Sequence, residues 1–149
     1  MNKVWSWFFV IVWMFVIFYL SHQPASESSR LSLSVADWLL SVISVILPDG
    51  LFVFEPFHFY IRKAAHFIAY FILGVLALRA FRVSGARGWK SVVCAFALSF
   101  VYAISDEFHQ LFVPGRGAQV RDVLIDGLGA LVGILLSIGF GKMKKRSRK

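Results

Sequence analysis

The residue types best suited to acid–base chemistry gather in one polar stretch, residues 105–126. Its first part carries Asp106, Glu107, His109 and Gln110. On a helix, Asp106, His109 and Gln110 share one face, whereas Glu107 lies off to the side. Carboxylates next to an imidazole can exchange protons with a bound molecule, so this stretch is a candidate site for general acid–base catalysis.

The second part of the stretch adds an arginine and two further carboxylates. Residues 113–116 read Val-Pro-Gly-Arg, with Pro and Gly where a type II turn places them. This turn would reverse the chain and direct Arg116 back over the preceding helix end. Asp122 and Asp126 then lie one helical turn apart. A guanidinium beside acid and base groups can hold a phosphate or carboxylate.

A second polar stripe begins at residue 62, inside an apolar part of the chain. Arg62, His66 and Tyr70 are spaced four residues apart, and Lys63 lies on the same helical face. Because such groups are costly against lipid, we expect the stripe to face the interior of a helix bundle. There it could transfer protons or hold an anion. For Lys63, an ammonium that reaches the membrane surface is an equally good explanation.

We expect both sets to converge on one outward-facing pocket, since they lie at the same ends of three apolar runs. The expected acid and base groups are His66, Asp106, Glu107 and Asp122. The expected substrate contacts are Arg62, Lys63, Tyr70, His109, Gln110, Arg116 and Asp126. We predict no metal ion and no other cofactor.

The elements that must position these residues are long and apolar. Of the 149 residues, 58% are hydrophobic, above the ~45–50% of an ordinary soluble domain. The excess lies in four runs suited to crossing a bilayer, at about 4–20, 62–81, 89–106 and 123–141. In the last run, Gly129 and Gly133 give a small-residue face for close helix packing. We therefore predict an all-α membrane protein, a single domain over residues 1–149 with four transmembrane helices.

The first apolar run could also be a cleaved signal peptide, because Lys3 provides a charged start. Against this, the run is bulky and aromatic, and no clear Ala-x-Ala site follows it. We favour a retained membrane anchor.

The segment between the first two runs is more polar. We interpret residues 21–34 as a loop and residues 35–47 as a short amphipathic helix in the membrane interface, because the latter has one narrow polar face and is too short to span. Residues 51–60 place many aromatic side chains around a proline, which suggests a loop at headgroup depth.

Basic residues outnumber acidic ones, 16 against 8. Their placement indicates membrane orientation rather than nucleic-acid binding. With both termini in the cytoplasm, eleven of the 16 are inside, as the positive-inside rule favours. The basic tail, residues 142–149, would then lie against anionic lipid headgroups. The polar stretch and the start of the second run fall on the outer side.

Three other interpretations fit the sequence less well. His66 and His109 could join the carboxylates as metal ligands, but there is no His-Glu-x-x-His and no Cys pair, and nearby cations disfavour a divalent ion. Ser105 could be a nucleophile, yet no Gly-x-Ser-x-Gly surrounds it. A salt-bridge network could simply fix helix register, although buried ion pairs contribute little net stability.

At these residues the chain resembles the VanZ-like family of small membrane proteins. The matching features are Arg62-Lys63-x-x-His66-Phe67-x-x-Tyr70, Ser105-Asp106-Glu107-x-His109-Gln110, Phe112-x-Pro114-Gly115-Arg116, Asp122, a glycine-bearing last helix, and Ser21-x-x-Pro24 after the first run. Asp126 is a departure, because we expect Asn more often there, and an extra acid alters the protonation of the site.

The resemblance implies a four-span protein linked to low-level teicoplanin resistance, with no defined biochemical activity. Two functions compete. One is an enzyme acting on a lipid-linked or cell-envelope molecule at the outer leaflet. The other is a non-catalytic envelope protein whose charged cluster binds a ligand or fixes the fold. The expected partners are membrane lipids, with a lipid-linked envelope precursor or a glycopeptide as candidate ligands.

Overall fold

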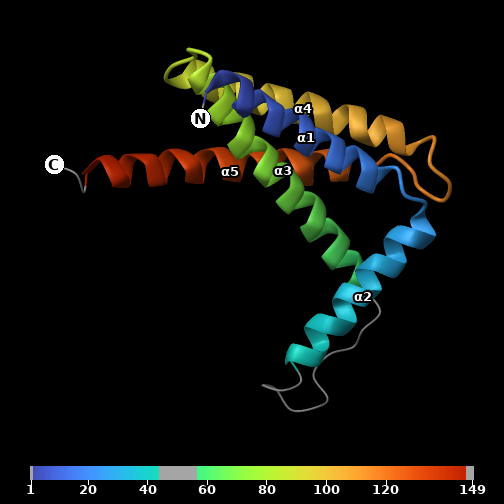
Figure 1. The fold of residues 1–149 in the computed structure, drawn as a ribbon. Coiled ribbons are helices and arrows are strands. Elements are labelled where there is room, and N and C mark those ends of the chain that lie inside the picture. Colours follow the sequence, from blue (N-terminus) through green and yellow to red (C-terminus); the bar gives the residue numbers. More distant parts are fainter. Residues whose placement is uncertain (1, 44–56, 147–149) are drawn as a thin grey trace.

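Helices make up almost all of the part of the chain that the computed structural model describes, residues 2–43 and 57–146 (Figure 1). The helices are α1 (Lys3–Ser21), α2 (Ala25–Ile43), α3 (Phe57–Val83), α4 (Trp89–Gln110) and α5 (Val120–Arg146). Four of them, α1, α3, α4 and α5, are long and apolar enough to cross a membrane. The predicted all-α class with four transmembrane helices is confirmed.

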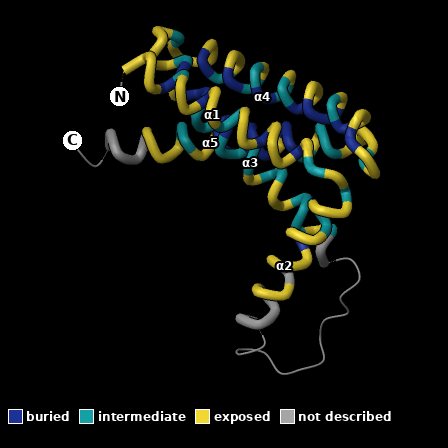
Figure 2. Tube along the Cα trace, turned by 45° about the vertical axis from the view of Figure 1, so that its right-hand side comes forward, coloured by how far each residue is buried: buried dark blue, intermediate teal, exposed yellow. Residues whose placement is uncertain are grey.

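Helix α3 is the centre of the bundle, because it packs against each of the other helices. Its buried residues Tyr70, Leu73 and Ala77 form the core together with Ala103 of α4 and other apolar residues. The outer faces of the helices remain apolar and exposed, as Figure 2 shows along α1 and α4. That distribution suits helices whose outer faces meet lipid rather than water.

Helices α3 and α5 approach each other through glycines. A Cβ atom on Gly129 would overlap the carbonyl oxygen of Phe67, and one on Gly133 would overlap that of Phe71. Gly74 of α3 meets the carbonyl of Ala130 in the same way. The predicted small-residue face on the last helix is confirmed, and α3 is the helix that packs on it.

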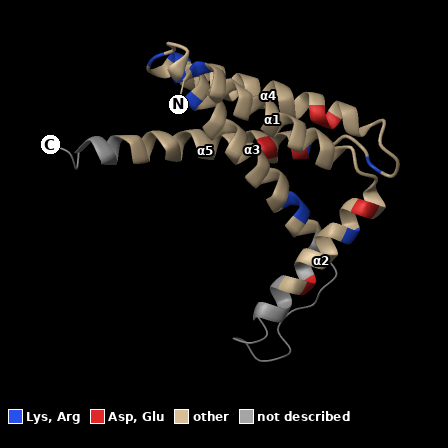
Figure 3. Cartoon of the chain, viewed as in Figure 1, with Lys and Arg blue, Asp and Glu red and all other residues tan. Residues whose placement is uncertain are grey.

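The two ends of the bundle differ in composition. At one end, the Trp7 indole N–H donates to the Ser84 hydroxyl at 2.9 Å, which ties α1 to the α3–α4 turn. Gly85 and Gly88 give this turn its positive φ angles, 101° and 58°. Figure 3 shows basic residues around this end, and acidic residues where α3, α4 and α5 come together. The C-terminal ends of α1 and α4 and the N-terminal end of α5 lie at this opposite end of the bundle, which is called the second end below.

Helix α2 begins at Ala25, so the prediction of a loop over residues 21–34 is wrong. Pro24 starts the first turn, where its missing N–H costs nothing, and its carbonyl accepts from the Ser28 N–H at 3.0 Å. The Ser32 hydroxyl donates to the Ser28 carbonyl at 2.9 Å. Serines suggest a loop in the sequence, but here their hydroxyls bond to carbonyls of their own helix.

Other boundaries also shift. Helix α3 starts at Phe57, so the last part of the 51–60 stretch is helical rather than loop. Helix α4 runs on to Gln110, and α5 continues through Arg146 into the basic tail. The end of the predicted 35–47 helix and the start of the 51–60 stretch fall within residues 44–56, outside the described residues.

Candidate functional site

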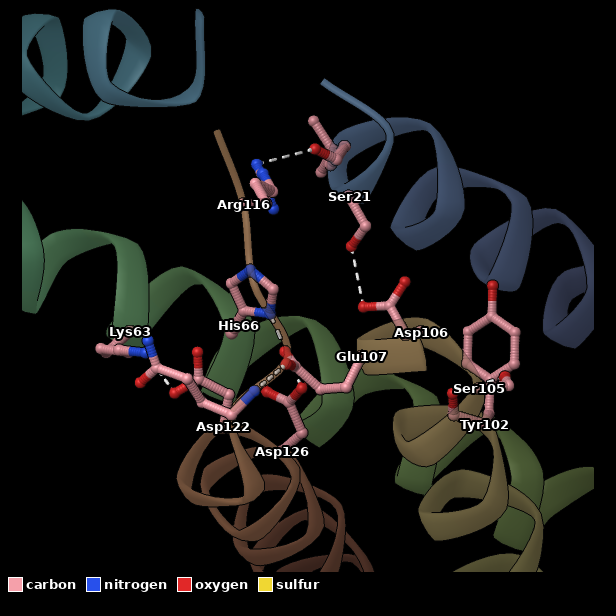
Figure 4. A network of polar contacts seen from close by, with 12 residues as sticks. Ser21, Lys63, His66, Tyr102, Ser105, Asp106, Glu107, Arg116, Asp122 and Asp126 are labelled. Carbon is pink, nitrogen blue, oxygen red and sulfur yellow. Dashed lines mark hydrogen bonds and ion pairs between the residues drawn. The ribbon is translucent and has the colours of Figure 1, made fainter. Parts of the chain in front are cut away.

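Polar side chains from four helices and one loop meet at the second end of the bundle (Figure 4). The residues of this polar cluster are Ser21 of α1, Lys63 and His66 of α3, Asp106 and Glu107 of α4, Arg116 of the α4–α5 loop, and Asp122 and Asp126 of α5. Residues distant in sequence are therefore brought together, because the ends of antiparallel helices lie side by side here.

The innermost contact joins His66 of α3 to Asp126 of α5. The His66 Nδ1 lies 3.6 Å from Asp126 Oδ2, an ion-pair separation longer than a hydrogen bond. Asp126 is completely buried, whereas His66 keeps 21% of its side chain exposed. A buried carboxylate beside an imidazole fixes the orientation and tautomer of the ring, which is how an acid–base histidine is positioned.

Asp106 completes this inner group from α4. It is 3% exposed, and its Oδ2 accepts a hydrogen bond from the Ser21 hydroxyl at 2.8 Å. His66, Asp106 and Asp126 each place one ligand-type atom within 4.8 Å of the others. Ser21 was not predicted as a site residue. The available signal was the Ser-x-x-Pro pattern, which marks a polar side chain at the last position of an apolar helix.

Glu107 lies about 100° from Asp106 around α4, off to the side as predicted, and it is buried like Asp106. Residues on a helix are about 100° apart, so Asp106, Gln110 and Glu107 span an arc of roughly 100° with Gln110 near its middle. That arc faces the bundle. The Glu107 Oε2 accepts a hydrogen bond from the Gln119 backbone N–H at 2.8 Å, which holds the α4–α5 loop against α4.

His109 lies about 60° outside that arc, on the Asp106 side, and contacts α1 instead of the cluster. Its Nε2 is 3.1 Å from the Nδ1 of His22, and its ring packs 4.6 Å from the ring of Phe18. The sequence prediction that His109 shares a working face with Asp106 does not describe this arrangement. His22 was missed, because nothing in its local sequence indicates that α1 ends beside α4.

Lys63 forms an ion pair with Asp122, which links α3 to α5. Their side chains are only 12% and 18% exposed, so Lys63 is held in an ion pair within the protein rather than free in solvent. The Lys63 ammonium also lies 5.0 Å from the Phe59 ring centre, a cation–π contact. Both charges of the pair are therefore largely satisfied within the protein.

Arg116 follows the predicted type II turn. Gly115 has φ +74°, and the Arg116 N–H donates to the Val113 carbonyl at 3.1 Å. The guanidinium points to the end of α1 rather than α4, with Nη2 3.5 Å from the Leu20 carbonyl. Burial lowers the pKa of Arg116, and the positive charge of Arg62 lowers it further. An arginine stays charged even so, so a permanent cation faces the cluster.

The polar cluster lies within a segment matched by a known family model. The VanZ/LLP1 model matches residues 6–141, which include most of the first span, the other three spans and every residue of the cluster. The chain belongs to the VanZ/LLP1 family. Neither a curated protein nor a solved structure matches it.

Two tyrosines and Ser105 lie near the cluster of this VanZ/LLP1 protein without joining its hydrogen bonds. Tyr70 is fully buried one turn below His66, and its hydroxyl has no hydrogen-bond partner in the described part of the chain. Tyr102 donates to the Met14 carbonyl at 2.6 Å. The exposed Ser105 donates to the Tyr102 carbonyl at 2.8 Å, on the side of α4 away from His66, which disfavours a nucleophilic role (Figure 4).

Two cavities open on the cluster. A polar cavity of about 100 Å³ is lined by charged and amide side chains, among them Lys63, Gln110, Gln119 and Asp122. An apolar groove of about 220 Å³ lies between α1, α2 and α3, with Ile17, Leu31, Val35 and Ile61 among its walls. Arg62, His66 and Arg116 line both cavities. These three side chains therefore lie where the polar cavity meets the apolar groove.

Proposed function

We propose that this multi-pass VanZ/LLP1 protein binds a membrane amphiphile with an anionic headgroup, such as a lipid-linked envelope precursor, and modifies it by acid–base chemistry. The observation that carries the proposal is the junction of the polar cavity and the apolar groove at Arg62, His66 and Arg116. An amphiphile has the same division into a polar and an apolar part.

The headgroup would be held by the two arginines. In the described residues the ion pairs are Lys63–Asp122 and His66–Asp126, so neither Arg62 nor Arg116 is paired with a carboxylate. Two guanidiniums on one cavity repel each other, and the charge of Arg62 is felt at Arg116. A phosphate or carboxylate between them would remove that repulsion and accept charge-assisted hydrogen bonds from both.

The apolar part of the ligand would lie in the groove between α1, α2 and α3. Its lining residues Ile17, Leu31 and Val35 continue into exposed apolar side chains on α2. A volume of about 220 Å³ admits a segment of a hydrocarbon chain but not a glycopeptide antibiotic. Any effect on teicoplanin would therefore follow from a changed envelope molecule rather than from binding the antibiotic inside the protein.

The chemistry would centre on His66. Its ring lies between Arg116 and the buried Asp126 in Figure 4, so it adjoins both the proposed headgroup site and a carboxylate. In that position it can take a proton from an attacking hydroxyl or water, or give one to a leaving oxygen. Asp106 and Asp126 would stabilise the charged ring. Glu107 and Asp122 already have partners, so we assign them to positioning.

Orientation supports an outer-leaflet reaction. The site lies at the end of the bundle opposite the α3–α4 turn and the N-terminus, where basic residues gather (Figure 3). The positive-inside rule places that basic end in the cytoplasm and the cluster outside. The basic residues after residue 141 would then contact anionic lipids of the inner leaflet.

A non-catalytic role is favoured by one different observation. Each of three contacts in the cluster joins two separate elements: Ser21–Asp106, Lys63–Asp122 and Glu107–Gln119. A network of this kind could serve to lock the bundle and shape a ligand site without any reaction.

An experiment on near-isosteric variants distinguishes the catalytic role from the non-catalytic one. Asp106→Asn and His66→Gln keep the size of the side chains but remove proton transfer. Cells expressing them at the wild-type level should lose teicoplanin tolerance and accumulate a substrate-like envelope lipid, because transition-state interactions are removed. His22→Gln and Asp37→Asn are matched controls outside the cavities and should behave as wild type. Full tolerance in folded Asp106→Asn and His66→Gln would contradict the catalytic proposal.

A further inference from the structure

The inner group of the polar cluster has the composition of a metal site. His66, Asp106 and Asp126 come from three different helices, and their ligand-type atoms lie within 4.8 Å of one another. One imidazole with two carboxylates is a ligand set used for Zn²⁺, Mn²⁺ and Fe²⁺. Closeness of three ligand-type atoms does not by itself show a metal site. The hydrogen bonds that each of these atoms makes are therefore considered next.

The carboxylates of this group lack the hydrogen bonds that buried carboxylates require. Asp126 is 0% exposed, yet neither of its oxygens has a hydrogen-bond partner among the described residues. Asp106 is 3% exposed, and its Oδ1 likewise receives no hydrogen bond from the described chain. Leaving such atoms buried and unpaired costs several kcal/mol unless a proton or a cation compensates them.

Apart from His66 itself, no protein cation in the described residues is paired with a carboxylate of the group. The Lys63 ammonium is paired with Asp122, one turn before Asp126 on α5. The Arg116 guanidinium contacts the Leu20 carbonyl. Neither cation forms an ion pair with Asp106 or Asp126 in the described part of the chain, so these two carboxylates remain available to offset the charge of a divalent ion.

We propose that His66, Asp106 and Asp126 bind one divalent transition-metal ion, with Zn²⁺ or Mn²⁺ as the best-matched class. Ligand atoms about 2.1 Å from a metal lie roughly 3.4 Å apart in a tetrahedral site and up to about 4.2 Å apart in an octahedral one. The three ligand atoms, which now lie within 4.8 Å of one another, would have to approach by up to about 1.4 Å for a tetrahedral ion and by less for an octahedral one. Two carboxylates balance the charge of the ion.

Ser21 supports the same assignment. Its hydroxyl donates to Asp106 Oδ2 at 2.8 Å, so the other oxygen, Oδ1, is left free while the carboxylate is held in place. This is the arrangement of an outer-shell residue that orients a metal ligand. His66 lines both cavities, so a coordination position left open by the protein would face the polar cavity. The inference does not require the proposed substrate. With the ion bound, His66 would be neutral and its ligating nitrogen engaged, so proton transfer at an occupied site would fall to a water on the ion rather than to the ring.

Metal content of the purified protein tests the proposal. The full chain, carrying a tag without histidines, is stripped with chelator in detergent and titrated with Zn²⁺ and with Mn²⁺. Bound metal is measured by elemental analysis, and the melting temperature is followed in parallel. We expect about one equivalent of one of the two ions per chain, with a rise in Tm as the ion binds the folded state.

Variants locate the ion. Asp126→Asn and His66→Gln should each weaken binding by at least about tenfold, since each removes a ligand. Asp37→Asn, which changes an exposed carboxylate of α2 outside both cavities, should retain the metal. His22→Ala removes the His22–His109 pair, whose ring nitrogens 3.1 Å apart form the competing candidate, and should also retain it. Two ligand variants are compared, so that if one of them fails to fold, the metal content of the other still tests the site.

The contradicting outcomes are equally definite. Less than about 0.1 equivalent bound at saturating free metal, with no change in Tm, would exclude the site. Loss of the metal in His22→Ala with retention in Asp126→Asn would move it to the histidine pair. Failure here is distinct from failure of the proposed function, because metal is measured without lipid. Arg62→Gln should lose the amphiphile and keep the metal.

Discussion

Gly129 of α5 lies directly against the backbone carbonyl of Phe67 on α3, so close that a Cβ atom on the glycine would overlap the carbonyl oxygen. Phe67 is the neighbour of His66, and Gly129 is one helical turn after Asp126. This close approach therefore fixes the separation of the two helices at the level of the His66–Asp126 contact. The glycine acts on the site through the backbone, without any polar atom of its own.

Replacing this glycine should loosen the site and the bundle together. Gly129→Ala places a methyl group on the Phe67 carbonyl, and we expect a loss of about 1–3 kcal/mol of unfolding free energy from overpacking. The matched control is Gly139→Ala on the same helix, where a Cβ atom meets nothing within 4 Å. That change should be neutral or stabilising by up to about 1 kcal/mol, from helix propensity. Unfolding in detergent measures both, and equal stabilities would refute the argument.

The Lys63–Asp122 pair should couple α3 to α5 energetically. Both side chains are mostly buried, so removing one leaves the other charge without its partner. We expect Lys63→Met or Asp122→Asn alone to lower stability by about 3–5 kcal/mol, and the double variant to lose clearly less than the sum. A double-mutant cycle followed by denaturant unfolding provides the measurement. Additive losses would show that the two charges do not interact.

Local rules were sufficient for part of this structure. The Val-Pro-Gly-Arg sequence predicted the turn, because Gly115 can adopt positive φ and Pro114 suits the preceding position. Spacing of Gly129 and Gly133 predicted close helix packing, since an i, i+4 pair lies on one helix face. The length and polarity of the four apolar runs predicted the spans. Each of these inferences depends on a single segment of the chain.

Features that depend on two segments were not predictable in this way. Ser21 meets Asp106 and His22 meets His109 only because the end of α1 lies beside the end of α4. The buried part of the circumference of α4 is set by its neighbours α3 and α5, not by its own pattern, so Glu107 is buried whereas His109 contacts α1. The start of α2 was missed because its serines bond within the helix.

The proposed membrane orientation, with the polar cluster outside, can be tested with single cysteines. Ser26 is exposed at the start of α2, at the polar-cluster end, and Ser84 is exposed at the opposite end in the α3–α4 turn. In a Cys94→Ala background, an impermeant thiol reagent should label Ser26→Cys on intact cells. Ser84→Cys should react only after permeabilisation, because the basic end is expected inside. The reverse pattern would place the cluster in the cytoplasm.

The arginines at the junction of the two cavities should determine which lipids stay with the purified protein. Arg62→Gln and Arg116→Gln each remove a charge-assisted hydrogen bond worth about 1.5–3 kcal/mol, which corresponds to roughly a 10–100-fold loss of affinity for an anionic headgroup. The matched control is Arg82→Gln, an exposed arginine at the other end of α3 that lines neither cavity. Native mass spectrometry of protein purified in mild detergent would report retained anionic lipid for all three. Retention should fall for the first two and remain at the wild-type level for Arg82→Gln. Because all three variants lose one positive charge, an equal fall in the three would mean that lipid is held by the overall charge of the chain rather than by this site.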